Sequence, residues 1–194
     1  MPRLRYIEES EKTLKTSAMI ESSKRTGAPD PRVVSIMTRS YVGTAWVELW
    51  NTVLYEGVLP HKLKEMCRIQ ISVAHQCGYC STVRSNVAKA EGLTENMIND
   101  LFSFETSRHF TPREKAALRY ASLFKQGGHA IDKDEVYQAL AKHFGDEEII
   151  ELGLLCAQTD GVGKFVKSLN VISWEEACEI NPRLGQTATQ VAAE

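Results

Sequence analysis

Apolar residues recur at helical spacing along almost the whole chain, and this pattern limits the fold more than any other feature. The clearest example runs from Val33 to Leu49, where apolar side chains fall three or four residues apart. Capping signals bound other such segments. Residues 111–114, Thr-Pro-Arg-Glu, have the pattern of a capping box with proline at the first helical position. Asp146 places negative charge where another helix is expected to begin. The sequence therefore predicts an all-α fold.

Three other segments carry expectations of their own. In residues 63–75 the apolar side chains also alternate with period two, so a strand stays open and only the helical neighbours favour a helix. A helix is predicted from Ser81 to Ala90. In the helix that starts at Asp146, we expect Gly161 and Gly163 to cause a kink or an interruption.

Length and composition limit the class of protein. The 194 residues fit one domain with extensions, and we expect an N-terminal arm (1–30), a helical domain (31–175) and a C-terminal tail (176–194). A formal net charge of −2 argues against a nucleic-acid or membrane partner. The sequence has no apolar run of about 20 residues and no signal-peptide pattern at its start. These features predict a cytoplasmic protein.

Cys77-Gly-Tyr-Cys80 is the strongest chemical signal in the chain. The cysteine count is odd and no export signal is seen, so a CxxC is more typical of redox or metal chemistry than of a structural disulfide. If the helix continued past Cys80, Arg84 would share the face of both cysteines. A guanidinium there would stabilise a thiolate, although it could not accept a proton.

The alternatives for these residues are structural or metal-binding. A zinc site needs two further ligands, and neither His75 nor Cys67 completes a recognised second half-site. We therefore expect no metal and no other cofactor. His75 fits a core or surface histidine better than a proton relay. The remaining cysteines stand alone among apolar or helical neighbours and are predicted to be packing residues; they are Cys67, Cys156 and Cys178.

From Val33 to Val171 the sequence resembles the alkylhydroperoxidase D (AhpD) and carboxymuconolactone decarboxylase family. The resemblance rests on Glu65, twelve residues before Cys77, and on the CxxC itself. Three further runs are similar to the family: residues 88–95 (AKAEGLTE), 111–118 (TPREKAAL) and 145–152 (GDEEIIEL). The resemblance implies an AhpD-like helical bundle that is an obligate oligomer, a trimer or a hexamer.

The resemblance also implies roles for site residues. Redox members carry a Glu, a CxxC and a His four residues after the second Cys, and the Glu and His relay protons to that Cys. Carried over, Glu65 is the relay carboxylate, Cys80 the attacking thiol and Cys77 the resolving thiol. Arg84 stands at the His position, and Tyr79 stands where some members have another His. We expect Glu65 to pair with Arg84 beside the thiolate, with Glu65, Tyr79 or water as the remaining proton donors.

Two classes of function follow. The first is a peroxidase-like thiol oxidoreductase with peroxiredoxin-type activity, whose substrate is a hydroperoxide or another small molecule and whose reductant is a thioredoxin-like or lipoyl-bearing protein. The second is a cofactor-free lyase of the decarboxylase branch, in which Arg84 binds a substrate carboxylate and the cysteines are incidental. A non-catalytic redox sensor is a third hypothesis. The Trp46 and Trp50 pair is predicted to lie in the core or a subunit interface, or to line an apolar substrate pocket.

Overall fold

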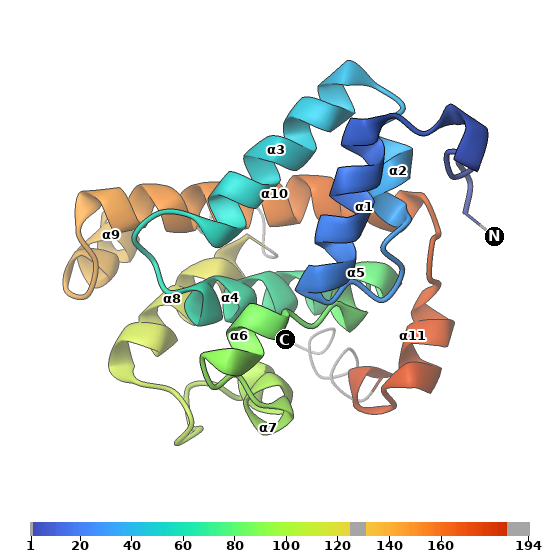
Figure 1. Ribbon diagram of the computed structural model, residues 1–194. Helices are drawn as coiled ribbons and strands as arrows, with labels where there is room; N and C mark the ends of the chain where they lie inside the picture. Colours follow the sequence, from blue (N-terminus) through green and yellow to red (C-terminus); the bar gives the residue numbers. More distant parts are fainter. Residues whose placement is uncertain (1, 125–130, 186–194) are drawn as a thin grey trace.

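The computed structural model describes residues 2–124 and 131–185, and every regular element in these residues is helical. The all-α prediction is confirmed for this part of the chain. The described elements, shown in Figure 1, are η1 (Glu9–Glu11), α1 (Leu14–Thr26), α2 (Val33–Met37), α3 (Tyr41–Tyr55), α4 (His61–Ala74), α5 (Gly78–Thr82), α6 (Asn86–Ala90), α7 (Glu95–Asn99), η2 (Asp100–Phe102), α8 (Pro112–Leu123), α9 (Asp134–Ala141), α10 (Asp146–Ser168) and α11 (Trp174–Ile180).

Helix α4 is the centre of the fold. It packs against α10 and α8 and also contacts α3, α5 and α6. Nearly all of its side chains are buried, with Met66, Cys67 and Ile69 wholly enclosed. Because α4 is buried on every face, its sequence has no single apolar stripe. The sequence pattern alone therefore does not decide between a helix and a buried strand. The structure resolves residues 63–74 as helix.

The long helix α10 extends across the molecule and supports α4 from one side (Figure 1). It is one continuous helix from Asp146 to Ser168. The predicted interruption at Gly161 and Gly163 is therefore wrong. Leu152 and Leu155 are fully buried against the core, and this packing outweighs the weak helix propensity of two glycines.

Helices α1 and α11 pack against short helices of the domain. Helix α1 lies on α2 and α6, and α11 lies on α5, where Ala177 is fully buried. The predicted boundary after residue 30 falls between α1 and α2, which are in contact, and the boundary after residue 175 falls inside α11. Both boundaries stay a prediction. Residues 186–194 of the expected tail lie outside the described residues. Within residues 2–124 and 131–185, no helix combines the length and apolar character needed to cross a bilayer.

Candidate redox site

A disulfide joins Cys77 and Cys80 at the junction of α4 and α5. After α4 ends, Gln76 adopts a left-handed conformation with φ of 54°, and this turns the chain sharply. Cys77 then caps α5, where its sulfur accepts a hydrogen bond from the Cys80 N–H at 3.3 Å. The Cα atoms are 5.3 Å apart, an ordinary distance for a disulfide. The two sulfurs are therefore held in bonding range by the local turn.

The helix that carries Cys80 is shorter than the sequence suggests. It ends at Thr82, Val83 is extended, and Ser85 caps the separate helix α6 by accepting from the Ala88 N–H at 3.3 Å. The prediction of one helix from Ser81 to Ala90 is wrong for this reason. Arg84 consequently lies in a linker and does not share a helical face with the cysteines.

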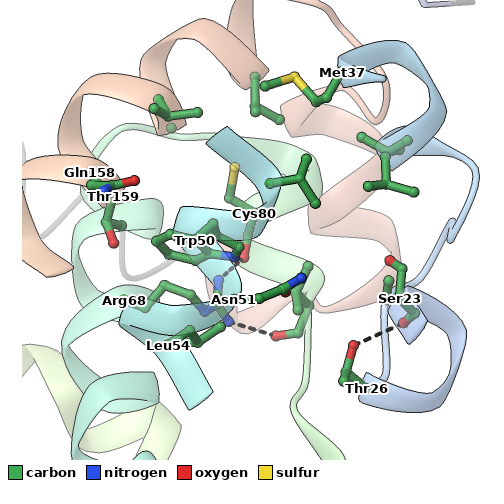
Figure 2. Close-up of a pocket in the computed structure, with 18 of the residues that line it drawn as sticks. Ser23, Thr26, Met37, Trp50, Asn51, Leu54, Arg68, Cys80, Gln158 and Thr159 are labelled. Carbon is green, nitrogen blue, oxygen red and sulfur yellow. Dashed lines mark hydrogen bonds between the residues drawn. The ribbon is translucent and has the colours of Figure 1, made fainter. Parts of the chain in front are cut away.

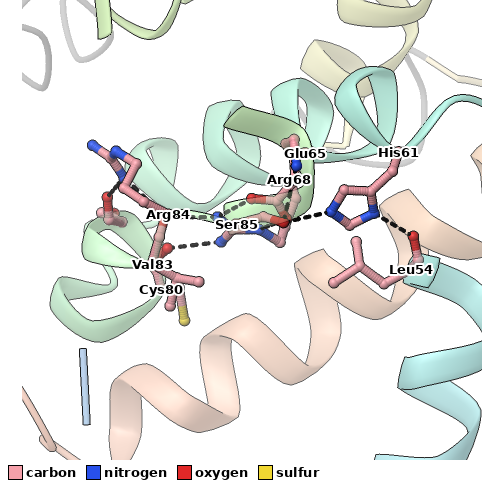
Figure 3. Close-up of polar contacts among 10 residues, drawn as sticks. Leu54, His61, Glu65, Arg68, Cys80, Val83, Arg84 and Ser85 are labelled. Carbon is pink, nitrogen blue, oxygen red and sulfur yellow. Dashed lines mark hydrogen bonds and ion pairs between the residues drawn. The ribbon is translucent and has the colours of Figure 1, made fainter. Parts of the chain in front are cut away.

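Arg84 does not pair with Glu65, which corrects the expected geometry. Its Nε lies 3.1 Å from a Glu95 carboxylate oxygen, and its Nη1 donates to the carbonyls of Ser81 and Val83 at 2.7 and 3.0 Å. Figure 3 shows its guanidinium pointing away from the Cys80 sulfur. Arg84 is also absent from the residues that line the cavity described below.

Arg68 occupies the place expected for Arg84 (Figure 3). Its Nε and Nη2 donate to the two carboxylate oxygens of Glu65 at 2.6 and 3.1 Å. Its Nη1 and Nη2 also donate to the carbonyls of Cys80 and Val83 at 2.8 and 3.1 Å. Arg68 thereby caps the last turn of α5 while neutralising Glu65.

Glu65 is 1% exposed, so its carboxylate is buried together with the Arg68 guanidinium. Sequence analysis missed Arg68, although its position three residues after Glu65 on one helix was an available signal.

A cavity of about 180 Å³ opens beside the disulfide (Figure 2). Cys80 lines it together with Glu65, Arg68 and Tyr79, whereas Cys77 is 0% exposed and does not reach it. Burial raises the pKa of Tyr79 well above the usual range of a phenol, so its hydroxyl stays protonated at neutral pH and is a poor acid. The two sulfurs of the pair therefore have different surroundings.

Most of the cavity wall is apolar and comes from helices distant in sequence. Trp46 and Trp50 of α3 stack with ring centroids 5.7 Å apart, and the Trp46 indole N–H donates to Gln158 of α10 at 2.8 Å. The pair lines an apolar cavity, which is the alternative that the sequence left open beside a place in the core or a subunit interface. Met19 of α1 and Met37 of α2 also line the cavity. The cavity has room for a small organic molecule next to Cys80.

A histidine lies behind this site on the α4 side. His61 Nδ1 lies 2.8 Å from the Leu54 carbonyl, and its Nε2 lies 2.7 Å from the Ser85 hydroxyl (Figure 3). A carbonyl only accepts, so Nδ1 carries the proton in the neutral ring. Tyr55, which lines the cavity, stacks on this ring with centroids 4.7 Å apart. His61 thus fixes Ser85 at the start of α6, a role that the sequence did not indicate.

His75 is also buried, at the end of α4. Its Nε2 lies 2.7 Å from an Asp160 carboxylate oxygen, which is an ion-pair distance if the imidazole is protonated. Burial lowers the pKa of His75 below 6.5, while Asp160 raises it and Lys164 lowers it. His75 is therefore predominantly neutral at pH 7. In the described part of the chain, no cluster of three or more His, Cys, Asp and Glu side chains forms a metal site.

Residues 41–123 match the sequence profile of the carboxymuconolactone decarboxylase family. An uncharacterized protein of Bacillus subtilis, YdfG, is 26% identical over 95 residues, which are 49% of this chain and 65% of that protein. An uncharacterized protein of Mycobacterium tuberculosis is 33% identical over 90 residues, or 45% of this chain and 31% of the relative. The matched region thus spans less than two thirds of either curated relative.

Solved structures share the fold over more of the chain. The debrominase Bmp8 superposes with a TM-score of 0.69 at 19% identity, covering 97% of both chains. A variant of it with one cysteine changed to alanine was solved with 2,3,4-tribromopyrrole. A protein of unknown function from Agrobacterium tumefaciens, provisionally named as an AhpD antioxidant defence protein, covers 70% of this chain and 93% of its own at 20% identity and a TM-score of 0.60. Residues 41–123 thus match the carboxymuconolactone decarboxylase family in sequence, and the fold that the chain shares with these solved structures is AhpD-like.

Proposed function

We propose that the Cys77–Cys80 pair is the redox centre of a thiol-dependent oxidoreductase that reduces small organic hydroperoxides. The observation that carries this proposal is the unequal placement of the sulfurs: Cys80 lines the cavity, and Cys77 is buried behind it. Such a pair separates the thiol that meets the substrate from the thiol that closes the disulfide. The apolar wall favours an organic hydroperoxide over hydrogen peroxide.

The reaction balances with the two thiols as the reductant. The Cys80 thiolate attacks the distal oxygen of the hydroperoxide, the O–O bond breaks, and the alkoxide takes the proton that the Cys80 thiol released. The Cys77 sulfur then attacks the Cys80 sulfenic acid, and hydroxide leaves as water with the Cys77 proton. One hydroperoxide and two thiols give one alcohol, one water and the disulfide. A thioredoxin-like or lipoyl-bearing dithiol protein would restore the pair by thiol–disulfide exchange.

Arg68 is the cation best placed to assist this step. It lines the same cavity as Cys80, donates to the Cys80 carbonyl and is held by Glu65, so its guanidinium is fixed beside the backbone of the reacting residue. A fixed cation favours the thiolate over the thiol. The lyase hypothesis is weakened by the same geometry, because Arg84, its carboxylate-binding residue, is paired with Glu95 outside the cavity.

The test is the consumption of cumene hydroperoxide with dihydrolipoamide as the reductant. We expect Cys80→Ser to abolish turnover and Cys77→Ser to leave a sulfenic acid that dimedone traps. Cys178→Ser is the matched control and should keep full activity, because Cys178 is not part of the cavity wall. Full activity in the Cys77→Ser/Cys80→Ser double variant would show that the proposal is wrong.

Reductive removal of a halide from an aromatic ring is the second candidate. The whole-chain fold likeness to a debrominase, and the binding of a brominated ring by that protein, favour it. The two thiols would supply two electrons and two protons, so that the aryl halide gives the arene, the hydrogen halide and the disulfide. Bromide release from a bromopyrrole, measured beside hydroperoxide consumption on the same preparation, decides between the two substrates.

A further inference from the structure

Two hydroxyl groups in the cavity wall have no hydrogen-bond partner among residues 2–124 and 131–185. Ser72 on α4 is 1% exposed and Thr159 on α10 is 5% exposed, and both residues line the cavity. Buried hydroxyls are ordinarily paired, because removing them from water without a partner is unfavourable. Their unpaired state at the edge of a cavity indicates a partner supplied by a bound molecule.

The positions of these hydroxyls relate them to the disulfide and to the aromatic wall. The Ser72 carbonyl accepts the Cys77 N–H at 3.1 Å, so Ser72 is one hydrogen bond away from the redox turn. Thr159 directly follows Gln158, which accepts the Trp46 indole N–H. The two residues come from α4 and α10, helices that pack together along the core. Figure 2 shows Thr159 in the same wall as Trp50 and Cys80.

The cavity volume limits the molecule that fits. An apolar protein cavity of about 150 Å³ holds a benzene molecule, and this cavity has about 180 Å³. The stacked Trp46 and Trp50 rings present flat apolar surface, which pairs well with another ring. The wall is therefore matched to one ring with a small substituent.

We infer that Ser72 and Thr159 form a hydrogen-bonding subsite of the cavity, and that the cavity takes a single-ring aromatic compound whose polar group reaches these hydroxyls. This inference rests on the proposed function for its catalytic meaning, because it names the substrate class of the same cavity. The ring lies against the tryptophan pair, and the polar substituent is held near Cys80.

The experiment measures binding and needs no turnover. Phenol and toluene have nearly the same shape, but only phenol has a hydrogen-bonding group, so their affinities separate the polar contact from apolar burial. Binding is followed by tryptophan fluorescence, excited at the red edge of the band where phenol does not absorb. Trp46 and Trp50 line the cavity and report on binding, whereas Trp174 is not part of the wall and gives a constant background.

Wild-type protein should bind phenol at least as tightly as toluene, although toluene is the more hydrophobic of the two. Ser72→Ala and Thr159→Val should each weaken phenol binding by about three- to tenfold and leave toluene binding unchanged, since one hydrogen bond is lost. Thr159→Ser keeps the hydroxyl and should keep phenol affinity.

Ser81→Ala is the matched control. The Ser81 hydroxyl is also buried and unpaired and lies one residue after Cys80, but Ser81 does not line the cavity. It should bind phenol like the wild type. Tighter binding of toluene than of phenol by the wild type, or an equal loss in the Ser81 and Thr159 variants, overturns the inference.

The outcomes also separate this inference from the proposed function. If phenol binds through Ser72 and Thr159 but Cys80→Ser leaves hydroperoxide turnover intact, the subsite stands and the redox proposal is wrong. If Cys80 is essential but the two probes show no preference for the hydroxyl, the redox proposal stands and the subsite is wrong.

Discussion

Among single residues, Arg68 makes the contacts that connect the site. It links three parts of the chain, because one guanidinium binds the Glu65 carboxylate and the carbonyls of Cys80 and Val83. Glu65 and Arg68 are both almost fully buried, so each depends on the other for compensation of its charge. A buried charge without its partner costs far more than a surface charge in the same state.

Arg68→Met should lower the free energy of unfolding by about 3 kcal/mol or more, because it leaves the Glu65 carboxylate buried without a counter-charge. The Glu65→Gln/Arg68→Met double variant should recover part of this loss. Urea denaturation at pH 7 measures both changes. A double variant less stable than Arg68→Met would contradict the pairing. Arg119→Met, which removes an exposed ion pair with Glu105, is the control, and its free energy of unfolding should fall by less than about 1 kcal/mol.

His75 should make stability depend on pH. Since burial lowers its pKa below 6.5, the unfolded chain binds the proton more readily than the folded one. Its contribution is complete above about pH 6.5 and is lost as the pH falls below that value. His75→Gln should flatten the stability profile in this range. Asp160→Asn should lower the pKa of His75 further, because the Asp160 carboxylate raises it. An NMR titration of the imidazole measures this pKa, and a higher pKa in the variant would contradict the prediction.

At the scale of elements, the five-residue helix α5 depends on what surrounds it. Its last carbonyls are satisfied by the guanidinium groups of Arg68 and Arg84, and α11 lies on its first residue. A helix of this length is not stable alone, so tertiary contacts hold the redox turn in place. The short distance between α5 and α11 explains the glycine in the CxxC.

Gly78→Ala should destabilise the protein strongly, by about 2 kcal/mol or more, because its Cβ would lie 2.3 Å from the Ser173 carbonyl oxygen and 2.4 Å from that of Ile172. Gly161→Ala on α10 is the control: no atom lies within 4 Å of its Cβ, and a helix-interior Gly→Ala change should stabilise by about 0.5–1 kcal/mol. Thermal unfolding measures both. Equal stability of the two variants would contradict the close contact of α5 with α11.

The elements also show what local sequence can and cannot predict. The starts of α8 and α10 were predictable, because Thr111 and Asp146 act on their own helix ends. The break after Thr82 was not predictable, because it depends on Arg68, which donates to the carbonyls of Cys80 and Val83, 12 and 15 residues later in the chain. The same non-local contact places Arg68 between Glu65 and Cys80, where the sequence predicted Arg84.

At the scale of the whole molecule, the described cysteines fall into three environments. Cys67 and Cys156 are enclosed in the core, Cys178 is partly exposed on α11, and Cys77 and Cys80 form the disulfide. Burial raises the pKa of the Cys67 thiol to about 12 and that of Cys156 well above its usual range, so both stay protonated and unreactive. The interpretation of Cys67 and Cys156 as packing residues is confirmed.

Mass spectrometry after mild reduction and brief iodoacetamide treatment should find label on Cys80 first, because it alone of the pair lines the cavity. Cys67 and Cys156 should be labelled only after unfolding in urea. Label on Cys67 in the folded protein would contradict the enclosed core.

The outer face of α3 bears on assembly. Tyr41 is 88% and Val42 74% exposed, an unusual amount of apolar surface for one helical turn. We propose that this turn contacts a second copy of the chain in the trimer or hexamer that the family resemblance implies. Light scattering should give a mass above that of one chain for the wild type and a lower mass for Tyr41→Glu, with Lys89→Glu on α6 as a surface control. A wild-type monomer would contradict the assembly.

The residues that line the cavity come partly from inside and partly from outside the stretch that matches the family profile. Residues 41–123, which match the family profile, contain the disulfide, Glu65 and Arg68. Met19 of α1, Met37 of α2 and Gln158 of α10 come from outside that stretch. Changes in the flanking helices can therefore alter the shape of the cavity while the disulfide, Glu65 and Arg68 stay the same. Exchanging α1 between relatives is thus a direct route to new selectivity on an unchanged sulfur pair.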